Sequence, residues 1–290
     1  MLLTTVLLAL AIAAVWLPAL RLGRVAVPPS LPLAAAALLA GLQAGVVDAR
    51  GAVAAVALAA LGLASRAVAA PWPRRLLAVA AVLLAFALGL RLVPGFSPMV
   101  FLDGVRLSPD AAPMRFAVNA DAGLAGLVLA LCFCRRVQGL AEAGVVLRRA
   151  LPVALGTAAV VLMAGWAVGQ VRPDLKWPGF AAAWLLKMLL WTCVLEEAFF
   201  RGVIQERLAA WGAIASRPAL HALPLLVAAG LFGLAHFPGG WGYVALATLA
   251  GLGYGWAYAR TRRIEAAIAA HFVLNAAHFV GFSYPALLRA

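Results

Sequence analysis

The chain has 290 residues, of which 66% are hydrophobic and only 11% are charged, and its mean hydropathy is +1.02. This composition differs strongly from that of a soluble globular domain and indicates an integral membrane protein. The formal net charge is +13, but the basic residues fall in short loops between apolar segments, so we interpret them as topology determinants in contact with the lipid bilayer and expect no nucleic-acid partner.

Apolar segments long enough to cross a bilayer recur along the whole chain. We count about ten, with a predicted range of about eight to ten because the third is short. They lack the period-two alternation of barrel strands, and a spanning segment that is not part of a barrel must be a helix. The sequence therefore predicts an all-α bundle of transmembrane helices. The segments are 1–20, 30–47, 51–65, 76–92, 117–134, 150–170, 178–200, 220–238, 241–259 and 264–283.

The basic residues predict the orientation of these helices. The first segment has no basic residue before it and Arg21 and Arg24 after it, which is the charge order of an uncleaved helix with its amino terminus outside. Because Lys and Arg concentrate on the cytoplasmic side, we expect a multi-pass plasma-membrane protein with both termini outside the cytoplasm. The loops assigned to the cytoplasmic side contain Arg21, Arg24, Arg66, Arg74, Arg75, Arg135, Arg136, Arg148, Arg149, Arg201, Arg207, Arg217, Arg260, Arg262 and Arg263.

Two features suggest how the chain is divided. The longest polar interruption, 95–116, has Pro, Gly and Asp at turn positions and is predicted to be an outward-facing loop. A second boundary near residue 149 separates helices with few polar residues from helices with several. We therefore predict accessory transmembrane helices over 1–149 and a functional core over 150–290.

The first candidate site residues are two carboxylates in the very apolar stretch WLLKMLLWTCVLEEAFFRG. Glu196 and Glu197 would be costly there unless water, a partner or a cavity receives them. Arg201 follows Glu197 with i, i+4 spacing, which suits an ion pair on one helix face and would leave Glu196 free to face a cavity. The alternative for Arg201 is a simple cation of the cytoplasmic loop.

The later helices carry further polar residues at helical spacing. Phe232 and His236 are i, i+4 in LFGLAHFPG, and His271 and Asn275 are i, i+4 in AAHFVLNAAHF. A lone histidine in a membrane helix is usually a core residue with satisfied hydrogen bonds. Two carboxylates, two histidines and an asparagine in three late helices instead indicate a functional site.

The order Glu-Glu-x-x-x-Arg, Phe-x-x-x-His, His-x-x-x-Asn, with each motif in an apolar helix, resembles the three motifs of the CPBP family of intramembrane proteases. That family includes the type II CAAX prenyl endopeptidases and bacterial bacteriocin-processing or immunity homologues. The resemblance covers 150–290, which would be the protease core. The Ala-, Leu- and Arg-rich composition suggests a bacterial member, in the inner membrane.

The resemblance implies hydrolysis of a peptide bond in a membrane-associated peptide or protein. In the family, the first glutamate and the histidine of the second motif are thought to activate water, and the His and Asn of the third stabilise the oxyanion. Carried over, Glu196 is the base, His236 is its partner, and His271 and Asn275 are the oxyanion donors. The remaining motif residues would support the site: Glu197, Arg201 and Phe232.

Alternatives remain at this stage. Glu196, His236 and His271 could hold a catalytic zinc with water in the fourth position. Because no His-Glu-x-x-His pair is present, we favour a site without a metal or other cofactor. A non-catalytic scaffold or bacteriocin-immunity protein of the same fold is the alternative function. A transporter is a weaker one, because transporters commonly show paired broken helices in two corresponding halves.

The predicted topology raises one difficulty. It puts Glu196 near the inner end of its span, His271 two turns in from the same side, and His236 close to the outer end. Contact among the three would require a long helix that continues past Arg201, or a shift of the eighth span.

Overall fold

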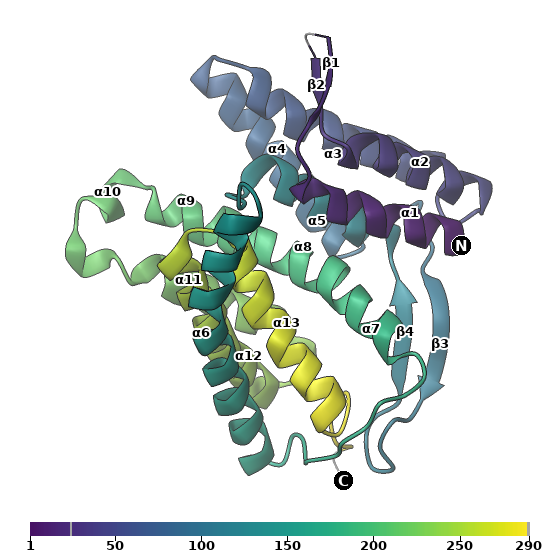
Figure 1. Ribbon diagram of the computed structural model, residues 1–290, viewed down its shortest axis with the longest axis vertical. Helices are drawn as coiled ribbons and strands as arrows, with labels where there is room; N and C mark the ends of the chain where they lie inside the picture. Colours follow the sequence, from purple (N-terminus) through teal and green to yellow (C-terminus); the bar gives the residue numbers. More distant parts are fainter. Residues whose placement is uncertain (24, 289–290) are drawn as a thin grey trace. The chain divides into compact units, whose positions relative to one another are not determined.

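The computed structural model describes residues 1–23 and 25–288 (Figure 1). Arg24, one of the cations in the predicted charge distribution, lies outside the described residues. The structure is 70% helical, with few strands and several helices apolar enough to cross a membrane. The prediction of an all-α membrane protein is therefore confirmed.

The structure locates the helices that are long and apolar enough to cross a membrane. By length and composition, 5 helices of the described chain are candidates to cross a membrane. The short third segment is in fact a helix of 19 residues. In contrast, the segments expected at 1–20, 30–47 and 117–134 form shorter apolar helices. The candidates are α3 (Ala49–Ala67), α4 (Pro71–Gly89), α6 (Leu140–Ala167), Pro218–Ala235, which includes α11 (Leu223–Ala235), and α13 (Ile264–Gly281).

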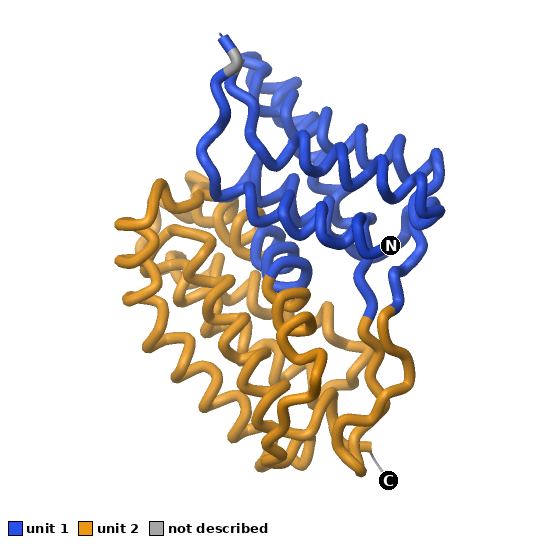
Figure 2. The backbone as a smooth tube through the Cα atoms, turned by 45° about the vertical axis from the view of Figure 1, so that its right-hand side comes forward, with its two compact units in different colours: residues 1–100, 117–134, 190–199 blue, residues 101–116, 135–189, 200–290 orange. Residues whose placement is uncertain are grey.

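The chain divides into two compact units, each assembled from segments that are distant in sequence (Figure 2). Neither unit coincides with one of the predicted domains, 1–149 and 150–290, which stay predictions about an accessory and a functional part. The first unit contains residues 1–100, 117–134 and 190–199, and the second contains 101–116, 135–189 and 200–290.

The first unit is built around α5 (Ala120–Phe133), a helix that is apolar apart from Asp121 in its first turn and is almost entirely buried, as expected for a helix with no solvent-facing stripe. Glycines let neighbouring helices approach closely. A Cβ atom at Gly62 would lie 2.8 Å from Val128. The other elements of this unit are α1 (Leu2–Ala13), η1 (Ala14–Trp16), the hairpin β1 (Leu20–Leu22) and β2 (Val25–Val27), α2 (Ser30–Gln43), α3, α4 and α8 (Val194–Glu197).

The polar segment 95–116 is not an irregular loop. It contains β3 (Met99–Val105) and leads into β4 (Met114–Val118), and the two strands form a two-stranded sheet. In β4, Met114, Phe116 and Val118 are buried and alternate with more exposed residues. This period of two is that of a half-buried strand. Asp103 and Gly104, which were predicted at turn positions, lie inside β3, whereas Asp110 lies in the turn between the strands.

The second unit is dominated by α6, α11, α12 (Trp241–Thr261) and α13, and α12 packs against each of the other three. Close approach again depends on small residues, since a Cβ at Gly251 would lie 3.1 Å from Ala229 of α11. The remaining helices of this unit are α7 (Ala181–Lys187), α9 (Glu206–Ala209), α10 (Gly212–Ala215), η4 (Pro218–Leu220) and η5 (Phe237–Gly239).

The helix of the first motif is longer than the predicted span 178–200. The chain is helical without interruption from residue 181 to residue 209, and so continues past Arg201. Two π-helical segments, η2 (Met188–Cys193) and η3 (Ala198–Gln205), flank α8. Such widened turns are rare in proteins and occur frequently at functional sites.

Candidate active site

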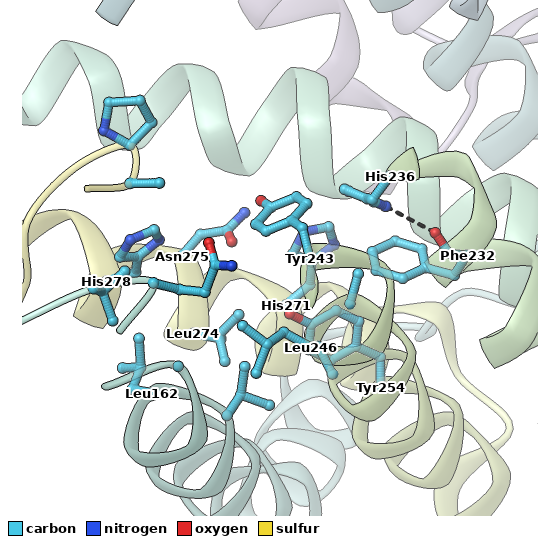
Figure 3. Close-up of a pocket in the computed structure, with 18 residues that line it drawn as sticks. Leu162, Phe232, His236, Tyr243, Leu246, Tyr254, His271, Leu274, Asn275 and His278 are labelled. Atoms are coloured by element: carbon cyan, nitrogen blue, oxygen red, sulfur yellow. Dashed lines mark hydrogen bonds between the residues drawn. The ribbon is translucent and has the colours of Figure 1, made fainter. Parts of the chain in front are cut away.

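A cavity of about 80 Å³ lies inside the second unit, among α6, α11, α12, α13 and the carboxyl-terminal segment (Figure 3). Four of the predicted site residues line it: Phe232, His236, His271 and Asn275. Because one water needs about 10–15 Å³ of such space, the cavity has room for several water molecules. The second and third motifs therefore meet at one site, as predicted.

The sequence around His236 explains its position. Helix α11 ends at Ala235, Pro238 follows three residues later, and Gly240 adopts φ 82°, so the chain turns directly after the histidine. The Nδ1 atom of His236 lies 2.8 Å from the carbonyl oxygen of Phe232 (Figure 3). Since a carbonyl only accepts, Nδ1–H donates in this contact, and the tautomer with its proton on Nδ1 has Nε2 as its acceptor.

His271 is held between two aromatic rings. Tyr254 of α12 stacks on it almost in parallel, with ring centroids 4.7 Å apart and an angle of 13°. Phe232 meets it edge-on at 5.7 Å. The side chain is only 4% exposed. Asn275 lies one turn later on α13 and lines the same cavity, so the i, i+4 spacing of the third motif does direct both residues to one face.

The two histidines are closer than the predicted topology suggested. Phe232 contacts both, at 4.6 Å from the His236 ring and 5.7 Å from the His271 ring. The helical run 218–235 is one of the candidates to cross a membrane, and His236 follows directly after it. The predicted eighth span, 220–238, ends three residues later than this run.

Arg201 is not a loop cation. It is 0% exposed, and its Nη2 donates a hydrogen bond of 2.9 Å to the carbonyl oxygen of Gly251. Its guanidinium carbon lies 4.8 Å from the centroid of the Phe232 ring and 5.3 Å from that of Tyr254, within the range of cation–π attraction. Arg201 therefore buttresses the aromatic wall beside both histidines. It must also be removed from the count of cytoplasmic loop cations.

One turn further along, a second side chain repeats this contact with α12. The amide nitrogen of Gln205 donates a hydrogen bond of 3.0 Å to the carbonyl oxygen of Gly255. Gln205 and Arg201 are thus four residues apart, as are the two glycines that accept from them. Without side chains on Gly251 and Gly255, the polar groups of the first-motif helix reach the backbone of α12 directly. Gln205 was not among the predicted site residues, although its i, i+4 spacing from Arg201 can be read from the sequence.

Glu206 ends this polar row and was also missed. It is only 7% exposed, and the hydroxyl of Tyr258 donates a hydrogen bond of 2.7 Å to its carboxylate. Arg262 and Arg135 form ion pairs with it at 2.8 Å and 3.2 Å. A buried carboxylate needs such partners. The signal in the sequence was a carboxylate that directly follows Gln205 in the same helical run.

Two tyrosines of α12 also belong to the cavity. Tyr254 stacks on His271, and the ring centroid of Tyr243 lies 5.6 Å from that of His236. They are eleven residues apart, about three helical turns, and therefore share one face of α12. That face includes Ala247 and Ala250, which also line the cavity. Neither tyrosine was among the predicted site residues, because the prediction relied mainly on charged residues and histidines.

The rim of the cavity is formed partly by the carboxyl-terminal segment, since Pro285 and Ala286 line it. This segment is attached to the loop after α6. The Lys176 ammonium donates to the carbonyl oxygen of Phe282 and to the Asp174 carboxylate. The Ser108 hydroxyl also donates to Asp174, and this hydrogen bond, followed by the contact with Lys176, holds the pKa of the Asp174 carboxyl below its ordinary value.

Glu196 and Glu197 belong to the first unit. There, Leu195 packs against glycines of α4 and α5, with potential Cβ atoms at Gly89 and Gly126 only 3.4 Å and 3.1 Å from it. Glu197 is fully buried, and Glu196 is partly buried. The π-helix η3 begins directly after Glu197, so the turn toward Arg201 is not a regular α-helical turn. The ion pair of Glu197 with Arg201, and the role of Glu196 beside the histidines, stay predictions.

The structure also bears on metal binding. Within residues 1–23 and 25–288, no group of three or more His, Cys, Asp or Glu side chains is arranged to hold a metal ion. The sequence had offered Glu196, His236 and His271 as an alternative zinc site. Removal of metal ions from the purified protein with a chelator tests that alternative directly.

Comparison with known proteins gives one match. Residues 177–277 match the family model described as type II CAAX prenyl endopeptidase Rce1-like. Comparisons with curated proteins and with solved structures gave no match. The matched segment contains every residue of the three motifs, from Glu196 to Asn275. This match confirms the predicted CPBP relationship, because residues 177–277 are similar to the Rce1-like type II CAAX prenyl endopeptidases.

Proposed function

We propose that this protein is an intramembrane endopeptidase that hydrolyses a peptide bond of a membrane-associated protein or peptide. One observation carries the proposal: His236, His271 and Asn275 line a cavity of water-holding size within apolar helices. The family match covers all three residues and includes Glu196. Peptide hydrolysis needs an admitted water, a base and donors for the oxyanion. The cavity has room for the water, and the matched segment contains side chains that can act as the base and the donors.

In this mechanism, Glu196 accepts a proton from a water molecule while the water oxygen attacks the scissile carbonyl carbon. The Nε2 atom of His236 accepts a hydrogen bond from the same water, because Nδ1 is already engaged by the Phe232 carbonyl. His271 and the amide of Asn275 donate hydrogen bonds to the oxyanion of the tetrahedral intermediate. The C–N bond then breaks, and protonated Glu196 returns its proton to the leaving amine. No metal takes part.

The aromatic surroundings position the catalytic groups. Tyr254 and Phe232 fix the ring of His271, and Arg201 holds both aromatic rings through cation–π contacts and its hydrogen bond to Gly251. Such preorganisation lets oxyanion donors act without rearrangement during the reaction. In this proposal Glu197 and Arg201 support the site and do not react.

Two other functions compete with this one. A non-catalytic scaffold or a bacteriocin-immunity protein of the same fold would not need the complete set of motif residues that this chain retains. A transporter would need a path for its cargo, whereas the cavity beside the histidines holds only about 80 Å³. Proteolysis is therefore the function that the site supports best.

The decisive experiment compares detergent-purified wild-type protein with the Glu196→Gln variant on a peptide library, with products identified by mass spectrometry. Wild-type protein should cleave a subset of peptides, and the variant should cleave none. The substitution keeps the size of the side chain and removes the base. If both proteins leave every peptide intact, or if both cleave equally, the proposal is wrong.

We further propose a multi-pass location in the plasma membrane, the inner membrane of a bacterium, with both termini outside the cytoplasm. The support is the distribution of basic residues between alternate loops. Reporter fusions after Arg75, Arg149 or Arg263 should read cytoplasmic, and a fusion at the carboxyl terminus should read external. A cytoplasmic carboxyl terminus would show that at least one span has been assigned wrongly.

A further inference from the structure

A second, larger hollow lies between α6 and α12 on the outside of the second unit. This groove measures about 460 Å³, far more than the cavity beside the histidines. Its walls are almost entirely apolar. The residues that form these walls include Val153, Gly156, Val160, Leu249, Leu252 and Trp256.

Two glycines account for the shape of the groove. A Cβ atom at Gly253 would collide with the side chain of Thr157, so the missing side chain lets α12 approach α6. Gly156 is different, because a Cβ there would meet no heavy atom within 4 Å. Gly156 therefore leaves empty space on the α6 side. A larger side chain at this position would fill the groove without disturbing the packing of the helices.

One end of the groove is positively charged. Arg260 lines it, and the guanidinium carbon of Arg260 lies 5.9 Å from the centroid of the Trp256 ring. Arg149 is exposed and precedes Val153 by four residues on α6, so both lie on the face that forms the groove. Trp256 is 54% exposed. A tryptophan and cations at the end of an apolar surface are typical of the membrane interface.

We propose that this groove binds an anionic phospholipid, with an acyl chain along the apolar walls and the phosphate at Arg149 and Arg260. The almost entirely apolar walls suit a hydrocarbon chain. Among the described residues, no Asp or Glu lines the groove, so its charge complements a negative headgroup. Basic pockets between membrane helices bind anionic headgroups in this way. An isoprenyl chain alone would satisfy the apolar walls but would provide no anion for the two arginines.

Photo-crosslinking tests this proposal and does not depend on catalysis. The full-length protein is reconstituted in nanodiscs with a trace of phosphatidylglycerol that carries a diazirine on one acyl chain, and labelled peptides are mapped by mass spectrometry. Phosphatidylcholine with the same diazirine chain serves as the neutral probe, and a diazirine-bearing isoprenoid serves as the uncharged one. The anionic probe should label 152–161 and 249–260 more strongly than either other probe.

Four variants identify the groove and its charged end. Gly156→Leu should suppress labelling of these segments, whereas Gly144→Leu should leave it unchanged, because Gly144 belongs to the same helix and also has open space around it. Arg260→Gln and Arg149→Gln should each reduce labelling by phosphatidylglycerol about fivefold, which corresponds to ~1 kcal/mol per charge near the membrane surface. Neither should affect labelling by phosphatidylcholine.

Arg148→Gln is the matched control for the charge, because Arg148 is exposed beside Arg149 but lies about 100° around the helix. Equal labelling by the anionic and neutral phospholipids would overturn the proposal. So would labelling that survives Gly156→Leu, or an Arg148→Gln variant that loses as much as Arg149→Gln. Preferential labelling by the isoprenoid would assign the groove to a lipid anchor instead.

Discussion

The two units of this protein are stabilised in different ways. In the first, the apolar helix α5 packs against its neighbours through glycines such as Gly62 and Gly126. In the second, side chains of the first-motif helix reach α12 through polar contacts, with Arg201 and Gln205 donating to backbone carbonyls and Glu206 held by charged partners. Apolar packing tolerates conservative change, whereas a buried polar network fails when one member is lost.

This difference has a functional meaning. A site that performs acid–base chemistry inside a membrane needs polar groups in fixed positions, and each such group must have a partner. The second unit supplies this by surrounding His236 and His271 with aromatic rings that are themselves fixed by Arg201. The first unit carries Glu196 on a helix held by packing of Leu195.

The largest expected effect is on catalysis. Glu196→Gln, His236→Ala and His271→Ala should each reduce cleavage by at least ~10²–10³, the loss seen when one oxyanion donor is removed. Rates of peptide cleavage by the purified variants provide the measurement, and size-exclusion chromatography checks that they remain folded. His221→Ala is a suitable control, because His221 is exposed and its Nε2 atom lies 3.3 Å from the Ala215 carbonyl oxygen, away from the cavity residues. A Glu196→Gln variant with undiminished activity would refute the mechanism.

A smaller effect concerns the stability of the two units. Glu206→Gln should lower the free energy of unfolding by about 1.5–3 kcal/mol, since it weakens hydrogen bonds to a charged group. Gly126→Ala in the first unit should cost a similar amount, about 1–3 kcal/mol, by overpacking against Leu195. Thermal unfolding in detergent measures both.

Salt distinguishes these two variants. The arginines that pair with Glu206 have side chains that are 59% and 40% exposed, so their attraction is screened by ions. The destabilisation caused by Glu206→Gln should therefore shrink at high salt, and that caused by Gly126→Ala should not. If both respond equally to salt, the contrast between a polar and an apolar unit does not hold.

A still smaller effect concerns the rim of the cavity. The pKa of Asp174 is lowered in the folded protein, chiefly by the hydrogen bond from Ser108. Its contribution to stability is therefore fully present above its ordinary pKa of 3.8 and is lost as the pH falls below that value. Because the side chain is 28% exposed, we expect less than about 1 kcal/mol. The pH dependence of unfolding should flatten in Asp174→Asn, and an unchanged profile would contradict this.

The last prediction is that chelation has no effect. If Glu196, His236 and His271 act through water alone, active protein should contain far less than one equivalent of zinc, and chelators should leave cleavage intact. A zinc enzyme would lose activity on chelation and regain it with added metal. Stoichiometric zinc that disappears in His236→Ala, together with reversible inhibition by chelators, would make Glu196 a ligand and overturn the metal-free mechanism.

Much of the site could be predicted because its residues obey local geometry. The spacing of Phe232 and His236, and of His271 and Asn275, fixes which face of a helix they share, and all four line one cavity. The depth of the second motif could not be derived in the same way. It depends on how α11 and α13 pack, and this packing brings the Phe232 ring into contact with both histidines.

By itself, the sequence determined that this is a helical membrane protein and which residues of the later motifs share a helix face, because apolar composition and helical periodicity are local properties of the chain. Only the tertiary structure decided that Arg201 is buried against Phe232 and Tyr254, that Gln205 and Glu206 extend the same polar row, and that Tyr254 stacks on His271. These contacts join residues up to tens of positions apart on different helices, and no periodicity within one helix encodes such pairings.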